Sequence, residues 1–374
     1  MVCSYRKRDN NADALTSNAT IAPIRSLSTE SFTGDDLRFF HHFLLAARPH
    51  LPYGSEASWT TLVPAYSHEC PHLMHAILSL GATHYTLADH SQTGYTQMAI
   101  SHRGKSLQSL SAALSNLDNC TDVDLDGILA TCYTLVFQAY FMPDGLTDFA
   151  VMVRGCGMVT QHIISRFNGS KMFTLQTPEQ MTELLAPWLP TNAHPDHEVI
   201  DSCITDIDKL HSFLQSSGSR DFFNALRKIY LALKYSIRDA FFCLTEVYAI
   251  WCTMENHDFL KFIASSNRAV RVLFLHYIAI DTLMRPFMLS VRAQDRARAG
   301  LFLGADVMEK WAFAIYHSLP ANMQELVVNE MQIVSYESHK YMFQREISGY
   351  RSSTMEPGQI AGRGMIDTGS HTSL

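Results

Sequence analysis

The segment His68-Glu69-Cys70-Pro71-His72 matches the H-E-x-x-H signature of zinc proteases. That chemistry needs both histidines on one face of an unbroken helix, with the glutamate as general base beside a metal-bound water. Pro71 opposes this arrangement, because it disfavours helical backbone angles at Cys70 and removes an N–H donor between the two histidines. Pro71 fits better as the first residue of the following helix. A zinc hydrolase that uses His68, Glu69 and His72 is therefore the least favoured of three functional hypotheses.

The other histidines near this segment give no stronger metal signal. His72 and His75 could join His68 as ligands on a helix face, but packing or capping is the favoured role for these side chains. His41 and His42 are adjacent, and adjacent residues on a helix point to different sides, which is poor geometry for chelation.

Other chemical motifs are incomplete or missing. Asp122, Asp124 and Asp126 resemble the start of a calcium loop, but the rest of the loop is missing. Acidic residues at the start of a helix favour its positive N-terminal end, which explains them sufficiently. The sequence has no G-x-S-x-G elbow, no G-x-x-x-x-G-K-[ST] loop and no G-x-G-x-x-G. We therefore predict no catalytic residues, no enzyme activity and no cofactor in this chain.

Aromatic and methionine side chains concentrate in the C-terminal half of the chain. Such side chains line adaptable apolar pockets, although they also fill ordinary cores. The candidate pocket residues are Phe241, Phe242, Tyr248, Trp251, Phe274, Tyr277, Met284 and Phe287. They predict a pocket for a lipid-like or other apolar small molecule, with ordinary core packing as the alternative.

Composition restricts the class of protein. Hydrophobic residues make up 47% of the chain and charged residues only 17%, so much of the chain should be buried. The net charge of -7 means that binding to nucleic acid would need a local basic patch. No two cysteines form a C-x-x-C pair. We therefore expect the cysteines to act as small buried hydrophobic residues, in a protein of a reducing compartment. We expect no secretory signal, because Arg6-Lys7-Arg8 leads into polar sequence. We expect no membrane span, because no uncharged apolar run reaches about 20 residues.

Helical spacing of apolar residues dominates the sequence, and alternating strand patterns are essentially absent. We therefore expect an all-α fold. The expected helices fall over about 71–88, 98–117, 127–141, 146–167, 197–215, 220–254, 257–289, 293–318 and 321–346.

The predicted domain organisation follows from composition. Residues 1–30 are polar and basic and should form a disordered linker, and residues 349–374 should form a disordered tail. One helical domain is expected over 31–348. It has possible halves at 31–167 and 197–348, because prolines and Gly169 break any long element between them.

Three stretches resemble the regulatory region of fungal zinc-cluster transcription regulators, in particular the sterol-uptake-control type. Asp35–Pro52 is similar to the entry helix of that family and its following proline. Cys70–His84 is similar to its most recognisable helix, and Val272–Pro286 to its late apolar helix. The resemblance spans about residues 31–320 and implies an irregular multi-helix regulatory domain.

The N-terminal segment Cys3-Ser4-Tyr5-Arg6-Lys7-Arg8 resembles the end of the two-zinc, six-cysteine cluster of that family. The resemblance implies that Cys3 is a sixth zinc ligand, orphaned unless five further cysteines precede Met1. Zinc would then belong only to a longer form, and DNA would be bound only through that missing module. The alternatives are a natural loss of the cluster and a chance Cys-x-Tyr.

The resemblance implies a nuclear transcription regulator that controls a metabolic or secondary-metabolite gene set. It also implies a homodimer, or a dimer with a related regulator, and a sterol or other apolar small molecule as ligand. The second hypothesis is a stand-alone interaction protein that dimerises with a full-length partner without touching DNA.

Overall fold

Capped helix starts define much of the fold. The computed structural model describes residues 31–88, 94–175, 177–189, 195–291 and 305–339. Helix α1 (Gly34–His42) begins at a capping box, in which the Thr33 side chain accepts from the Asp36 N–H and the Asp36 carboxylate accepts from the Thr33 N–H. The same device begins α6 (Asp122–Tyr140) at Thr121 and α8 (Pro178–Leu185) at Thr177. The acidic residues were expected to precede a helix over 127–141, but α6 begins earlier, and Asp122 and Asp124 lie in its first turn.

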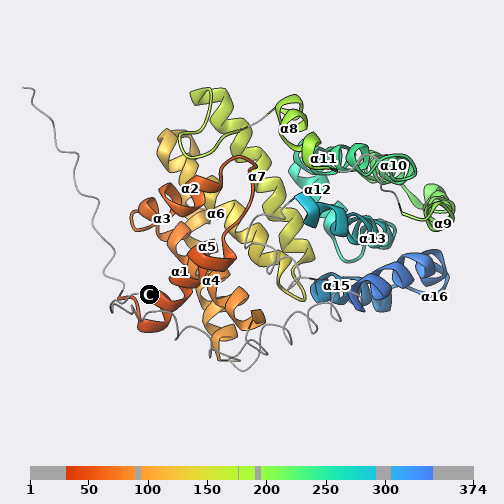
Figure 1. Ribbon diagram of the computed structural model, residues 1–374, viewed down its shortest axis with the longest axis horizontal. Coiled ribbons are helices and arrows are strands. Elements are labelled where there is room, and N and C mark those ends of the chain that lie inside the picture. The colour runs from red at the N-terminus through yellow and green to blue at the C-terminus, as the bar shows by residue number, and fades with distance from the viewer. Residues whose placement is uncertain (1–30, 89–93, 176, 190–194, 292–304, 340–374) are drawn as a thin grey trace, which may run out of the picture. The chain divides into compact units, whose positions relative to one another are not determined.

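The first half of the domain is arranged around α4 (Pro71–Ala88). This helix packs against α1, α5 (Tyr95–Leu114) and α6 (Figure 1). Helices α2 (Glu56–Thr60) and α3 (Leu62–Ser67) precede it, and α7 (Leu146–Phe167) packs against α6. Because Pro71 is the first residue of α4, the prediction that it begins a helix is confirmed.

The second half is arranged around α10 (Ser217–Leu233) and α13 (Arg268–Val291). Helix α10 packs against α13, α9 (His197–Asp208), α11 (Ile237–Thr253) and α12 (Asn256–Ile263). Helix α15 (Ala305–Ser318) packs against α13, and α16 (Ala321–Gln324) follows it. A final helical segment covers 328–339. The described residues contain no strand, which confirms the all-α prediction.

Two helices expected to be continuous are each divided in two. The expected helix over 220–254 ends at Leu233 and restarts at Ile237, because the Ser236 side chain accepts from the Asp239 N–H and caps a new helix. The expected helix over 257–289 is divided into α12 and α13. Asn267 precedes α13, and its side-chain oxygen accepts from the Val270 N–H at 3.4 Å. In both cases a local polar cap outweighs a continuous apolar pattern.

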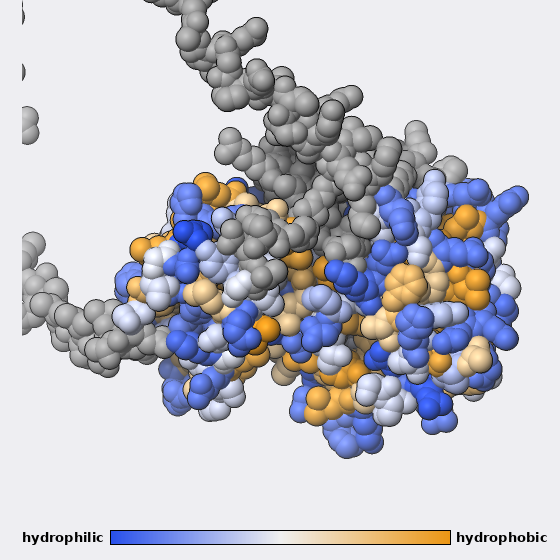
Figure 2. Space-filling view, turned by 90° about the horizontal axis from the view of Figure 1, so that it is seen from below, coloured by the Kyte–Doolittle hydropathy of each residue, from blue (hydrophilic) through white to orange (hydrophobic). Residues whose placement is uncertain are grey.

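The two halves share one large hydrophobic core, joined where α7 packs against α11. Figure 1 shows α7 between the N-terminal helices and α9–α13. The Trp311 indole N–H donates to the Met142 carbonyl across this junction at 2.7 Å. On the face in Figure 2, hydrophobic residues lie in patches among hydrophilic ones. In the part of the chain that is described, no helix is long and apolar enough to cross a membrane.

Candidate ligand cavity

A cavity of about 480 Å³ lies where the two halves meet. One wall comes from residues 46–53, α6 and α7, and the other from α11 and α13. Most of the lining side chains are aromatic or aliphatic, including Tyr133, Val136, Phe137, Tyr140, Phe141, Phe149, Val153, Phe241, Leu244 and Tyr248. This volume and this lining are typical of sites that bind drug-sized apolar molecules.

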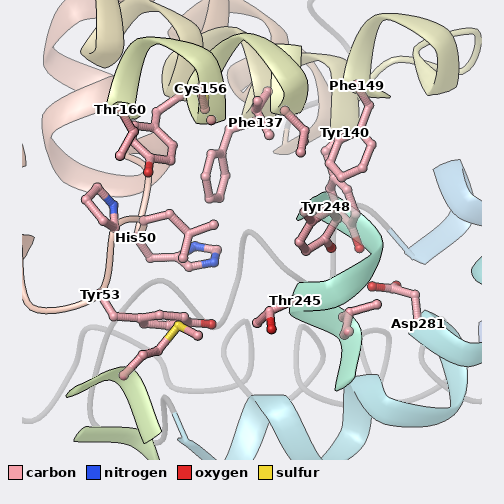
Figure 3. A pocket seen from close by; sticks show the side chains of 18 of the residues that line it. His50, Tyr53, Phe137, Tyr140, Phe149, Cys156, Thr160, Thr245, Tyr248 and Asp281 are labelled. Atoms are coloured by element: carbon pink, nitrogen blue, oxygen red, sulfur yellow. The ribbon is translucent and has the colours of Figure 1, made fainter. Parts of the chain in front are cut away.

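The segment 46–53 forms one side of the cavity and is held against the helices by rings and a hydrogen bond. The His50 ring meets Phe137 edge-on, with centroids 4.5 Å apart, and the Tyr53 ring lies 6.5 Å from Phe241. The Trp59 indole N–H donates to the Leu51 carbonyl at 2.9 Å, which fixes the segment from behind. Figure 3 shows His50 and Tyr53 on the side of the cavity opposite Tyr248.

The opposite side of the cavity carries a group of polar atoms. The hydroxyl oxygens of Tyr248 and Tyr277 are 3.2 Å apart and share a hydrogen bond. On the same side of the cavity, the Arg285 guanidinium donates to the Asp281 carboxylate at 2.8 Å. Burial raises the pKa of both tyrosine hydroxyls, and the nearby Asp281 charge raises it further, so both hydroxyls stay protonated. Figure 3 shows Tyr140, Tyr248 and Asp281 together on this side.

His84 of α4 also lines the cavity and is almost fully buried. Its Nδ1 lies 2.8 Å from Nε2 of His42, so one ring donates to the other. Burial, together with the neighbouring His42, lowers the pKa of His84 to about 3. The ring is therefore neutral at physiological pH.

Cys156 of α7 and Cys252 of α11 add two thiols to the wall. Burial raises the pKa of each thiol, most strongly for Cys156, whose pKa the neighbouring Cys132 thiol raises further. Protonated, buried thiols are poor nucleophiles and poor metal ligands. They act here as small apolar groups, as the sequence predicts.

Three of the eight candidate pocket residues line this cavity: Phe241, Tyr248 and Tyr277. Trp251 and Phe274 instead pack in the core against Phe222, with ring centroids 6.0 and 5.5 Å from it. Met284 is fully buried without lining the cavity, and Phe242 is half-buried and packs against the core. The Phe287 side chain lies outside the described residues. Binding of a ligand at these residues stays a prediction.

Sequence reasoning missed the other half of the wall. The residues of α6 and α7 that line the cavity follow the same three- and four-residue spacing as core positions, so no local signal separates the two. The segment 46–53 carries one cue, a run of His, Pro and Tyr after a helix, but nothing in the sequence places it against α11.

The H-E-x-x-H segment is not on a single helix. His68 and Glu69 are exposed before α4 begins, with His68 Nε2 3.5 Å from Glu69 Oε1. His72 is buried on α4, and its Nε2 lies 3.1 Å from the Cys70 Sγ. Within the described ranges, no group of three or more His, Cys, Asp or Glu side chains could hold a metal ion.

His75, the remaining candidate of that group, packs as its sequence favours. Its Nδ1 lies 3.0 Å from Nδ1 of His102, whose Nε2 lies 2.8 Å from the Asp36 carboxylate. Cys3, the proposed orphaned zinc ligand, lies outside the described residues.

One family model matches the N-terminal part of the domain. Residues 38–181 match the model of the fungal specific transcription factor domain. The matched segment includes most of α1, all of α4–α7 and the N-terminal wall of the cavity, whereas α11 and α13 lie beyond it.

The chain is also similar to Sterol uptake control protein 2 of Saccharomyces cerevisiae (strain ATCC 204508 / S288c). The two are 24% identical over 208 residues, which cover 54% of this chain. The chain spans only 21% of the length of that relative. No solved structure matches this chain. These similarities support a transcription regulator.

Proposed function

We propose that this chain is the regulatory part of a transcription regulator and that its cavity binds an apolar small molecule, of which a sterol is one candidate. The cavity, which lies between the two halves of a domain whose N-terminal part matches a fungal transcription factor family, is the observation that carries the proposal. The printed name of the relative supports a sterol as the first compound to test.

The position of the cavity supports a sensing role. A ligand there would touch α6 and α7 on one side and α11 and α13 on the other. It would therefore bind most tightly to the packing of the two halves that best encloses it. A ligand shifts the equilibrium between two packings only by the difference between its affinities for them. The control of a metabolic or secondary-metabolite gene set is the proposed output.

The remaining parts of the proposal concern partners and location. We place the protein in the nucleus, as a homodimer or a dimer with a related regulator. Direct DNA contact would need a zinc cluster upstream of Cys3. Mapping the 5′ end of the native transcript tests this part: an in-frame exon encoding C-x-x-C would support a DNA-binding regulator, and an in-frame stop codon directly upstream of Met1 would favour the dimerising interaction protein.

Thermal unfolding of the full chain with ergosterol tests the cavity. A ligand at 100 times its Kd stabilises the folded state by about 2.7 kcal/mol, which raises Tm by several degrees. Thr245 of α11 lines the cavity and Thr253 of the same helix is exposed outside it. We expect Thr245→Phe, which fills the cavity, to abolish the rise in Tm and Thr253→Phe to retain it. No rise in Tm with any sterol or related lipid would end the cavity proposal.

A further inference from the structure

The polar side of the cavity has hydrogen-bonding capacity beyond what its own residues use. Tyr248 and Tyr277 carry two hydroxyl hydrogens, and the bond between their oxygens uses one of them. The second hydroxyl hydrogen must therefore point elsewhere. Tyr248 lies beside Asp281 at this side of the cavity, within a lining that is otherwise largely apolar (Figure 3).

The charges at this side oppose a charged ligand. Asp281 pairs with Arg285 at 2.8 Å, so the pair contributes no net charge to the wall. A ligand carboxylate would approach Asp281 with like charge, and burying an ion without a dedicated partner is costly. Arg48, a further cation of the lining, is only partly buried and its guanidinium already donates to the Leu44 carbonyl at 2.7 Å.

An ionised carboxylate nevertheless has about four acceptor positions, of which the Arg285 bond uses one. A small group that both donates and accepts would fit between Asp281 and the tyrosine pair. It could donate to the carboxylate and accept the second tyrosine hydroxyl hydrogen. A hydroxyl group has this donor and acceptor set and no charge.

We infer that the cavity selects an uncharged apolar molecule with one hydroxyl group, and that Asp281 and the Tyr248–Tyr277 pair determine this selectivity. The inference rests on the proposed ligand-binding function and names the class of its ligand. A sterol and a long-chain fatty alcohol share this chemistry. The rest of the ligand lies along Phe137 and Phe149, where most of the lining is apolar.

The test is binding of the full chain to cholesterol and to cholest-5-ene, which has hydrogen in place of the hydroxyl group, both delivered from cyclodextrin. Hexadecan-1-ol and hexadecanoic acid form a second pair that separates a flexible alcohol from a carboxylate. Each alcohol should bind the wild-type chain about tenfold or more tightly than its partner. Cholesterol makes one or two buried hydrogen bonds that cholest-5-ene cannot make, and the carboxylate of hexadecanoic acid meets Asp281 with like charge.

Two variants locate the selectivity. Tyr248→Phe removes one hydroxyl with little change in shape, and Asp281→Asn removes the charged acceptor. Either should reduce the preference for an alcohol toward unity. Tyr235→Phe, the same change at an exposed tyrosine outside the cavity, should keep the full preference. The Tyr248→Phe result alone decides the matter if Asp281→Asn fails to fold.

The outcomes are distinguishable. Equal wild-type affinity for cholesterol and cholest-5-ene, tighter binding of hexadecanoic acid than of hexadecan-1-ol, or an unchanged preference in Tyr248→Phe would each overturn this inference and leave the ligand-binding function standing. If the wild-type chain bound none of the four compounds, this inference and the proposed cavity function would both fail. Selectivity for only one of the two alcohols would support the inference and identify the source of the hydroxyl.

Discussion

The sulfur atom of Cys252 on α11 occupies the space that a Cβ atom on Gly157 of α7 would need. This contact joins the two halves of the domain and lies in the wall of the cavity. The glycine leaves room for the thiol in its present position between the two helices.

Gly157→Ala should therefore destabilise the protein, because the new methyl group forces α7 and α11 apart or displaces the thiol. The expected loss is about 1–3 kcal/mol of unfolding free energy, typical of overpacking. Urea unfolding of the two single variants and the double variant Gly157→Ala/Cys252→Ala measures it. We expect the Cys252→Ala change to recover part of the loss, and strictly additive effects would show that the two residues do not clash.

A second close approach lies between α1 and α4. A Cβ atom on Gly81 would overlap the backbone carbonyl of Phe39, which cannot rotate away. Gly81→Ala should lower the unfolding free energy by about 3 kcal/mol, at the upper end of overpacking costs. Gly104, in the middle of α5, has open space around it, so Gly104→Ala should stabilise by about 0.5–1 kcal/mol. Equal effects of the two substitutions in urea unfolding would refute this interpretation.

Asp126 holds the segment that follows α7. Its carboxylate accepts from the backbone N–H groups of Lys171 and Met172 at 2.8 and 3.0 Å, and also from the Ser170 hydroxyl. Both N–H groups donate to Oδ2 and the hydroxyl donates to Oδ1, so the amide oxygen of Asp126→Asn can keep both N–H groups while its NH2 group faces the Ser170 hydroxyl. The substitution should cost about 1–3 kcal/mol, since the Ser170 hydroxyl loses its acceptor. Asp118→Asn, at an exposed position, is the matched control and should change stability little. Similar losses in both would contradict the anchoring role.

The fold should be less stable at acidic pH because two of its histidines are buried. Burial lowers the pKa of His84 to about 3 and that of His72 to about 4, from 6.5 in the unfolded chain. Between pH 6.5 and those pKa values the unfolded chain binds more protons than the folded chain. The folded state is therefore fully stabilised above pH 6.5, and its free energy of unfolding falls as the pH decreases below 6.5. At pH 5 each histidine should cost about 2 kcal/mol relative to pH 7.

Urea unfolding at pH 7 and pH 5 measures this dependence. His84→Gln and His72→Gln should each reduce the difference between the two pH values, because the substituted residue no longer binds a proton. His257→Gln changes an exposed histidine and should leave the difference as it is in the wild type. An unchanged difference in His84→Gln would show that this ring does not resist protonation in the folded state.

The sequence determined the features that depend on neighbouring residues. Helical spacing of apolar residues predicted the all-α fold, and Pro71 predicted the start of α4. The acidic residues from Asp122 predicted a helix directly after them, and the capping box at Thr121 instead begins the helix at Asp122 itself. These features rest on contacts within one or two helical turns, so a local pattern records them. The helix boundary at Ser236 was not predicted, because its only local signal is one polar capping residue within a continuous apolar pattern.

The tertiary structure decided the cavity. Trp251 and Tyr248 are three residues apart on α11, and both suited an apolar pocket by type, yet Trp251 fills the core and Tyr248 faces the cavity. Segment 46–53 and α13 are more than 200 residues apart, and only their packing on the helices between them brings both to one site. A cavity forms where side chains from distant parts of the chain do not fill the space between them. Helical periodicity is the same for residues that line a cavity and for residues that fill the core, so it does not distinguish them.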